Sequence, residues 1–329
     1  MLVATSACGP SLPPAGSGDA VDQRPPLVLV ELVPAQASVV VEASPTAIAA
    51  SPSLLAIAHA FAPDERLDAF SARHGVDPRT LDELVWADTE DGWLLLVRGP
   101  FMSRSVVGEV GARMAPVESS ADAPWMRRAG VYRGSRLELV ALEEHTLLLV
   151  AGAPSLTAAV LARAAGDDRE PGALGGAEVA ALRAEHLGRP LLVHAPQPLG
   201  LPLDSGVGLL LARETALLAS LHATEDGHVA LAVDLRGEFP PGADENFRAL
   251  VGSLADSDLG RAVGMEDAAS SLRAQADERQ VLLQTSVPAA VVASGLRVLF
   301  DAEIRELLAR ASSGRAASSP LVAELRQVR

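Results

Sequence analysis

The sequence predicts an α+β protein of two related modules, with a mainly antiparallel sheet and helices packed on one face. Two observations carry this prediction. Short runs that alternate large apolar residues with small or polar ones are typical of half-buried strands, and single helix-like segments rich in Ala, Leu and Val lie between them. Such an order of elements favours an antiparallel sheet. In addition, several stretches recur in the same order about 135 residues later.

The recurring stretches indicate a duplicated body. The tetrapeptide Thr-Glu-Asp-Gly occurs twice at an offset of 135 residues, each time just before an apolar run. A longer match at an offset of 134 pairs Pro154 with Pro288, and an Arg-Gly-x-Phe stretch recurs at 138. The matched stretches are, in chain order, 89–92 with 224–227, 98–101 with 236–239, and 143–156 with 277–290. Because two copies are too few for a solenoid, we expect paired modules.

The strands are expected where the apolar pattern has a period of two. Residues 228–239 show it most clearly, with Val229 and its alternate neighbours on one side and small or acidic residues opposite. Residues 92–99 read as a more fully apolar strand. Residues 137–152 read as two strands joined around 143–145.

Helices are expected after these strands in both modules. The predicted ranges are 53–73, 103–114 and 155–166 in the first module, and 177–186, 243–255 and 289–311 in the second. Pro154 and Pro288 each precede one of them. Proline is well placed there, because its missing N–H would be unbonded in the first turn of any helix.

Composition excludes several classes of function. All 27 basic residues are arginine, so no Schiff-base lysine or phosphate-loop lysine exists. The formal net charge of −15 opposes binding to nucleic acid, which depends on basic residues that neutralise phosphates. Aromatic residues, at 3%, offer few surfaces on which bases could stack. No nucleic-acid partner is expected.

The repeated Thr-Glu-Asp-Gly could be a metal loop or a turn. In the second copy it is flanked by His222 and His228, which with its carboxylates would be plausible transition-metal ligands. The first copy keeps the tetrapeptide but has Ala87 and Trp93 in the places of the histidines. What persists is the Asp-Gly signal of a hairpin turn. We therefore predict two hairpins and no metal site.

No motif of a catalytic or cofactor site is present. The chain lacks the GxSxG, HExxH, SxxK and CxxC patterns, and its glycine-rich stretches lack the spacing and context of nucleotide-binding loops. We assign no catalytic, cofactor-binding or metal-binding residue. A catalytic triad assembled from distant positions stays open as an alternative.

The N-terminus carries the one strong address signal. Cys8 is the only cysteine; the apolar residues 2–4 and the small residues 5–7 precede it, and a stretch rich in Pro, Gly and Ser follows. This pattern resembles the end of a bacterial lipoprotein signal peptide, whose lipobox places small residues before a cysteine that becomes lipidated. Thr5 stands where the lipobox usually has Leu, and seven residues are too few for a whole signal peptide. The resemblance implies lipidation at Cys8.

Together these features predict the organisation of the chain. Its expected parts are a signal-peptide remnant (1–7), a lipidated flexible tether (8–35), the first module (36–168), a linker (169–176), the second module (177–312) and a C-terminal tail (313–329). The linker is placed by its Gly, Pro and charge content.

The body resembles, without a specific motif, the duplicated uncharacterised α+β domains of bacterial envelope proteins. We expect a protein held by its lipid on the periplasmic side of a bacterial membrane, with a non-catalytic binding or structural role and no cofactor. Its protein or small-molecule partner is not identified by the sequence. Two alternatives remain. A pocket with Ser or Asp near a His of shifted pKa would favour a hydrolase, and a deep cleft between the modules would favour a solute-binding lipoprotein.

Overall fold

The computed structural model describes residues 25–117, 125–132, 134–168, 170–198, 214–262 and 264–297. Within these ranges twelve strands form one continuous sheet in which every neighbouring pair is antiparallel. The strands are β1 Val39–Ala43, β2 Glu83–Thr89, β3 Gly92–Arg98, β4 Ala115–Pro116, β5 Met126–Tyr132, β6 Ser135–Glu143, β7 Thr146–Gly152, β8 Leu191–Ala195, β9 Glu214–Ala223, β10 His228–Gly237, β11 Arg273–Ala276 and β12 Gln280–Pro288. The α+β class and the antiparallel sheet expected from the sequence are confirmed.

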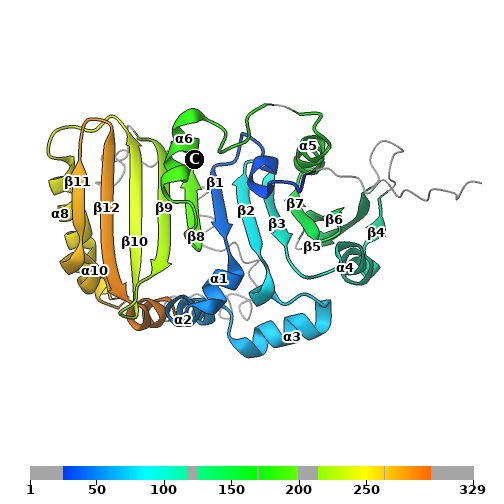
Figure 1. Ribbon diagram of the computed structural model, residues 1–329, viewed down its shortest axis with the longest axis horizontal. Helices are drawn as coiled ribbons and strands as arrows, with labels where there is room; N and C mark the ends of the chain where they lie inside the picture. The colour runs from blue at the N-terminus through cyan, green and yellow to red at the C-terminus, as the bar shows by residue number, and fades with distance from the viewer. Residues whose placement is uncertain are drawn as a thin grey trace, which may run out of the picture.

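The sheet has two halves with the same order of strands (Figure 1). The first half runs outward from the centre as β1, β2, β3, β7 and β6, with β5 and β4 beyond. The second half runs outward in the other direction as β8, β9, β10, β12 and β11. The halves meet at the antiparallel pair β1–β8, and Val41 pairs there with Val193. Counted outward from this central pair, the first five strands of each half follow the same chain order, and β5 and β4 have no counterparts among the described strands of the second half.

The register shows which residues correspond. We name two rows of directly paired residues that run across the sheet. The side chains of each row lie on one face, because directly paired residues of an antiparallel sheet do so. The Leu96 row contains, from the centre outward, Glu42, Val85, Leu96, Leu148 and Val140. The Asp234 row contains His194, Leu218, Asp234, Leu282 and Gln275.

Both copies of Thr-Glu-Asp-Gly form hairpin turns, but the two turns differ. In the first, Thr89 pairs directly with Gly92, which leaves a two-residue loop. In the second, the backbone N–H of Thr224 donates to the carbonyl of His228, and Gly227 adopts a left-handed φ of 82°. The register therefore relates β3 to β10 by the offset of 138 residues seen in the Arg-Gly-x-Phe match, not by 135. The tetrapeptide match reflects local turn chemistry.

One face of the sheet is covered along its length by helices. In the first half α4 (Ser103–Val110) packs Val106 and Val107 on Leu139 and Leu147. In the second half this face is covered by α2 (Pro52–Phe61), α8 (Ala243–Ala255) and the helical residues 289–297. Further helices are α1 Pro45–Ala50, α3 Asp64–His74, α9 Asp258–Ala262, α10 Met265–Ser271, η2 Pro78–Thr80 and η3 Gly111–Arg113.

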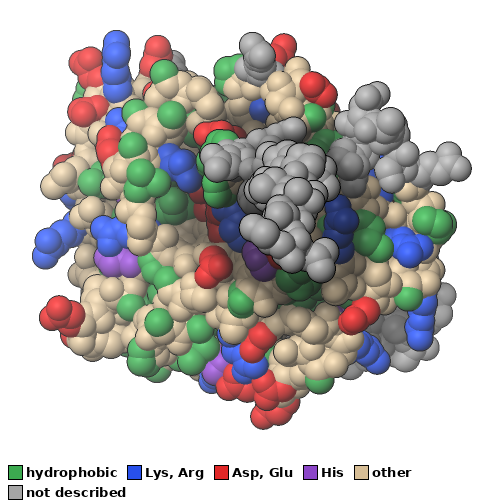
Figure 2. Space-filling view, turned by 45° about the vertical axis from the view of Figure 1, so that its right-hand side comes forward, with side chains coloured by type: hydrophobic (Ala, Val, Ile, Leu, Met, Phe, Trp, Pro, Cys, Tyr) green, Lys and Arg blue, Asp and Glu red, His purple; other side chains and the backbone are tan. Residues whose placement is uncertain are grey.

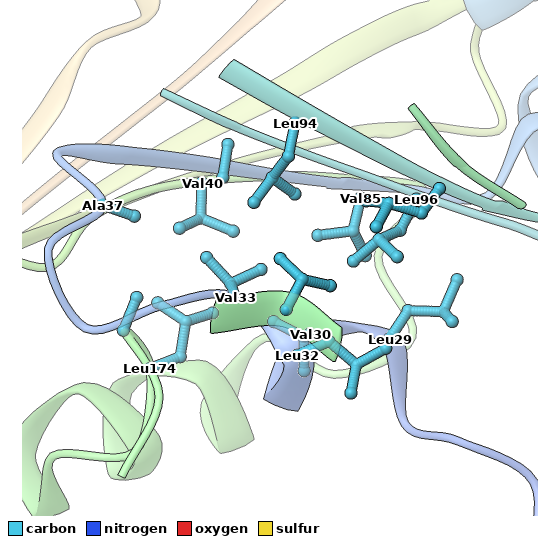
Figure 3. Close-up of a cluster of buried hydrophobic side chains, with 14 of the residues drawn as sticks. Leu29, Val30, Leu32, Val33, Ala37, Val40, Val85, Leu94, Leu96 and Leu174 are labelled. Carbon is cyan, nitrogen blue, oxygen red and sulfur yellow. The ribbon is translucent and has the colours of Figure 1, made fainter. Parts of the chain in front are cut away.

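The opposite face also carries helices, whereas the sequence analysis expected helices on one face only. Here η1 (Leu29–Leu32), α5 (Pro154–Ala165) and α6 (Ala177–Glu185) pack on the sheet. Leu29, Val30 and Val33 point toward the sheet residues Val40, Val85, Leu94 and Leu96 (Figure 3). Both faces need cover because residues 138–142 of β6 and most of β7 are buried, whichever way the side chain points.

Several expected boundaries shift. The tether expected at 8–35 cannot include 29–33, because Leu29, Val30, Leu32 and Val33 are buried in the core. Ala173 and Leu174 of the expected linker lie in the same cluster. The single helix expected at 53–73 is divided into α2 and α3 at Pro63, because a residue that precedes proline is driven out of the helical region. No helix among the described residues is long and apolar enough to cross a membrane.

Candidate functional site

A groove of about 850 Å³ lies on the second half of the sheet, on the face that carries η1 and α5 in the first half. Its floor is formed by β9, β10 and β12, and its walls by the end of α6 and by the segment from α10 to β11. The floor is low along β10 because Ala230 and Ala232 are small. The polar residues that line it are Glu185, His186, Arg189, His222, Asp234, Ser270, Ser271, Arg273, Gln280, Gln284, Thr285 and Ser286.

Asp234 is the most deeply buried charged residue of the groove, with 1% of its surface exposed. Its Oδ2 accepts hydrogen bonds from Gln280 Nε2 at 2.8 Å and from Arg236 Nη2 at 3.1 Å. Its Oδ1 is buried and has no hydrogen-bond partner among the described residues. Burial raises the pKa of Asp234, and the nearby Arg236 opposes this effect without cancelling it.

His186 lies beside this carboxylate. Its Nδ1 is hydrogen bonded to Ser220 Oγ at 3.0 Å. Burial lowers the pKa of His186, although the charge of Asp234 acts in the opposite direction. The imidazole is therefore held neutral at physiological pH and fixed in orientation by Ser220.

Glu185 completes a compact cluster. One oxygen or nitrogen atom from each of Glu185, His186 and Asp234 lies within 4.8 Å of those of the other two. Arg236 Nη2 also contacts Glu185 Oε2 at 3.3 Å, so one guanidinium nitrogen joins both carboxylates. The elements that bring the three residues together are the C-terminal end of α6, the turn after it and the middle of β10.

The two histidines around the second Thr-Glu-Asp-Gly do not meet. His222 pairs with Ala230 across the hairpin and lines the groove, and burial lowers its pKa. His228 Nδ1 lies 3.2 Å from Asp226 Oδ2. The ligand set considered from the sequence is thus divided between two places.

The groove brings together a serine, a histidine of lowered pKa and an aspartate, as the hydrolase alternative requires. All three come from the second half, His186 from the turn after α6 and the other two from β9 and β10, not from two modules. Ser220, with 2% of its surface exposed, is hydrogen bonded to His186 in the floor. A nucleophilic hydroxyl must reach the substrate, so the burial of Ser220 argues against this arrangement as a triad.

A second buried ionic cluster joins the two halves. Arg183 of α6 donates two hydrogen bonds to Glu42 of β1, at 2.7 and 2.6 Å, and His194 Nε2 of β8 lies 2.8 Å from Glu42 Oε1. Burial alone would raise the pKa of Glu42, but the hydrogen bonds from His194 and Arg183 outweigh it and lower the pKa to about 2. Arg183 also lines a small pocket of about 230 Å³ beside η1, and the cluster links the central strands to α6.

The sequence reasoning missed the groove residues. Glu185 and Asp234 are single acidic residues in unremarkable segments, and no motif marks them. The available signal was the polar side of 228–239, where two alanines and an aspartate lie opposite a fully apolar side. Cys8, the predicted lipidation residue, lies outside the described residues.

Charged side chains are mixed over the visible surface. On the face shown in Figure 2, acidic, basic and apolar side chains alternate, and the residues drawn in colour form no extended basic area.

Comparisons with known proteins show the fold alone. No protein-family model and no curated protein matches the sequence. Among solved structures, crystal form III of TP0453 is similar with a TM-score of 0.52 at 9% identity, over 83% of this chain and 99% of that one. Crystal form I of TP0453 matches with a TM-score of 0.45 at 10% identity, over 83% and 98%. The chain thus shares the overall architecture of TP0453 across nearly the whole length of that protein.

Proposed function

We propose that the protein is a lipid-anchored protein of the bacterial cell envelope that binds a small polar ligand in the groove and catalyses no reaction. The observation that carries this proposal is the groove itself. The groove lies on one face of the sheet. In the first half this face is covered by apolar side chains, whereas in the second half polar side chains line the groove. A concave site with a few converging polar groups is the usual form of a small-molecule site.

The charges of the groove limit the class of ligand. Arg189 lies on one wall and Arg273 on the other, and neither forms an ion pair within the described part of the chain. Glu185 and Asp234 supply negative charge at the floor. This arrangement fits a ligand that carries both an anionic and a cationic group, such as an amino acid or a short peptide.

The proposed anchor rests on the sequence around Cys8. In the lipobox-like context the thiol would carry the lipid, and the Pro-, Gly- and Ser-rich residues that follow would separate the membrane from η1. We also infer that the two halves descend from one duplicated unit. The matching strand orders and the collinear sequence matches support this origin.

Ligand binding is tested by thermal-shift and calorimetric titration of the full chain with amino acids and dipeptides, in buffer that contains a chelator. Ala232→Trp should fill the groove and abolish binding, whereas Val131→Trp, at an exposed position of β5, should leave it unchanged. If no ligand distinguishes the wild type from Ala232→Trp, the groove is not the site. Ester or peptide hydrolysis lost in Ser220→Ala would instead support the hydrolase.

The anchor is tested separately by growing cells that express the gene, with any in-frame upstream codons, on labelled fatty acid. We expect the label in the wild type and none in Cys8→Ser. Label that persists in Cys8→Ser would overturn the assignment of the lipid to this residue.

A further inference from the structure

We propose that Glu185, His186 and Asp234 form a binding site for a divalent transition-metal ion of the Zn²⁺ class. The site lies at the floor of the groove. It is distinct from the hairpin with His222 and His228, which the sequence analysis considered as a metal loop and interpreted as a turn.

The spacing of the three residues suits one ion. Their candidate ligand atoms lie within 4.8 Å of one another. Ligands of Zn²⁺ lie about 2.0–2.2 Å from the ion, so atoms around one tetrahedral ion are separated by roughly 3.3 Å. Small side-chain rotations, for which the exposed Glu185 has most freedom, would close the difference.

Asp234 offers an unused ligand atom. Its Oδ2 already accepts two hydrogen bonds, but Oδ1 is buried and unpartnered within the described residues. A buried carboxylate oxygen without a partner is costly, and a cation in contact with it would remove that cost. The single guanidinium nitrogen of Arg236 reaches Oδ2 only.

The hydrogen bond of His186 to Ser220 is of the kind that metal-binding histidines make. When its Nδ1–H donates to Ser220 Oγ, Nε2 keeps its lone pair and is available to an ion. Metal-binding histidines usually donate the other ring N–H to a neighbouring acceptor, which fixes the tautomer and the ring. Ser220 fills this role here, and this explains why a hydroxyl is buried under the groove.

The donor set selects the class of ion. One imidazole nitrogen and two carboxylate oxygens suit Zn²⁺ and related ions, whereas Mg²⁺ and Ca²⁺ prefer oxygen alone. Three protein ligands beside a groove leave a fourth position for water or a bound molecule, as in open zinc sites. Arg236 is the one cation in contact with the two carboxylates among the described residues, so the contacting groups retain negative charge for a cation.

The test is calorimetric titration of the full chain with ZnCl₂, in a Cys8→Ser background that removes the one thiol. We expect one site of micromolar affinity or tighter. His186→Ala and Asp234→Asn should each weaken it at least tenfold, and Ser220→Ala should weaken it by about 10–100-fold through loss of the orienting contact. His228→Ala, which removes a histidine paired with a carboxylate outside the cluster, is the matched control.

Circular dichroism and thermal melting of each variant would show that loss of binding is not loss of fold. A wild type without a 1:1 zinc site would overturn the proposal, as would a site that survives in both His186→Ala and Asp234→Asn. Either outcome would mean that Arg236, and not a metal ion, neutralises the carboxylates of Glu185 and Asp234. The ligand titration under Proposed function is done with chelator, so the two proposals can fail independently.

Discussion

The Leu96 row and the Asp234 row occupy corresponding places in the two halves of the sheet, and they differ in chemistry. In the first half Leu96 is completely buried under η1 and α5. In the second half the corresponding residue is Asp234, which is equally buried but lies in the floor of a polar groove. The next row shows the same contrast, with Ala87 and Val150 in the first half and Ser220 and Gln284 in the second.

The difference shows how one strand order yields two kinds of surface. Neighbouring strands pair antiparallel in both halves, so strand pairing alone does not decide whether the face of the sheet is covered. The side chains do. Apolar residues of the first half bury the apolar segment 29–33, whereas alanines and polar residues of the second half offer too little apolar area for such a cover.

The largest expected effect comes from placing the residue of one row in the other. Leu96→Asp should destabilise the fold by more than about 4 kcal/mol, because it leaves an unpaired carboxylate and a cavity in a dry core. Denaturant unfolding would measure the change in the free energy of unfolding. The reference variant is Leu96→Ala, for which about 2–5 kcal/mol is expected from the cavity alone.

The reciprocal change separates site from core. Asp234→Leu should fold with an undiminished unfolding midpoint, because it exchanges a buried carboxylate for an apolar side chain in a roomy place. If Leu96→Asp costs no more than Leu96→Ala, or Asp234→Leu fails to fold, the two rows do not differ as described.

The second effect concerns the link between the halves. Glu42→Gln removes the carboxylate that Arg183 and His194 share, and should cost about 3 kcal/mol. This value is at the low end of the free-energy cost of breaking a buried ion pair, because the side chain of Arg183 is 28% exposed. The free energy of unfolding of both proteins at pH 7 measures the effect.

The same link should weaken in acid. The pKa of Glu42 is lowered from 4.5 to about 2 in the folded protein, so its stabilising contribution is complete above pH 4.5 and is lost as the pH falls toward 2. The stability difference between wild type and Glu42→Gln should shrink over this range. A difference that is constant from pH 7 to pH 2.5 would contradict the assigned role of Glu42.

Much of the fold could be predicted from the sequence, because local periodicity reports local structure. The strand at 228–239, the hairpins and the helix starts after Pro154 and Pro288 follow from patterns within a few residues. The cover at 29–33 was missed because prolines and the neighbouring flexible composition suggested a tether. Its apolar run "LVLVELV" was the signal.

The groove could not be predicted in the same way. It depends on which strands are neighbours and on a register that differs by three residues from the tetrapeptide match. An odd change of register moves a side chain to the other face. The offset of 135 would make Val229 the counterpart of Leu94, although the side chain of Val229 lies on the opposite face of the sheet. Only the complete pairing places Asp234 where the first half has Leu96.

The two hairpin glycines provide a third, smaller comparison. A Cβ on Gly92 would lie 2.1 Å from the carbonyl oxygen of Ala151, on the neighbouring strand β7, whereas one on Gly227 would meet nothing within 4 Å. Gly227→Val should cost roughly 1–3 kcal/mol from positive φ alone. Gly92→Val should cost more, because the strand must also move. Equal losses in denaturant unfolding would contradict the close approach of β3 to β7.

The smallest expected effect is a gain in stability at the groove. Burial raises the pKa of Asp234 in the folded protein above its ordinary value of 3.8. The folded state therefore favours the protonated carboxyl, and stability declines as the pH rises from 3.8 through the raised pKa. Asp234→Asn, which cannot ionise, should melt at a higher temperature than the wild type at pH 7 but not at pH 3. A matched Asp226→Asn change, at an exposed turn, should show no such gain at pH 7.

With Zn²⁺ present the order of the two melting temperatures should reverse, because the ion favours the ionised carboxylate of the wild type and finds no equivalent in the Asp234→Asn variant. An Asp234→Asn protein less stable than the wild type at pH 7 without metal would show that the carboxylate is there for the fold and not for a ligand.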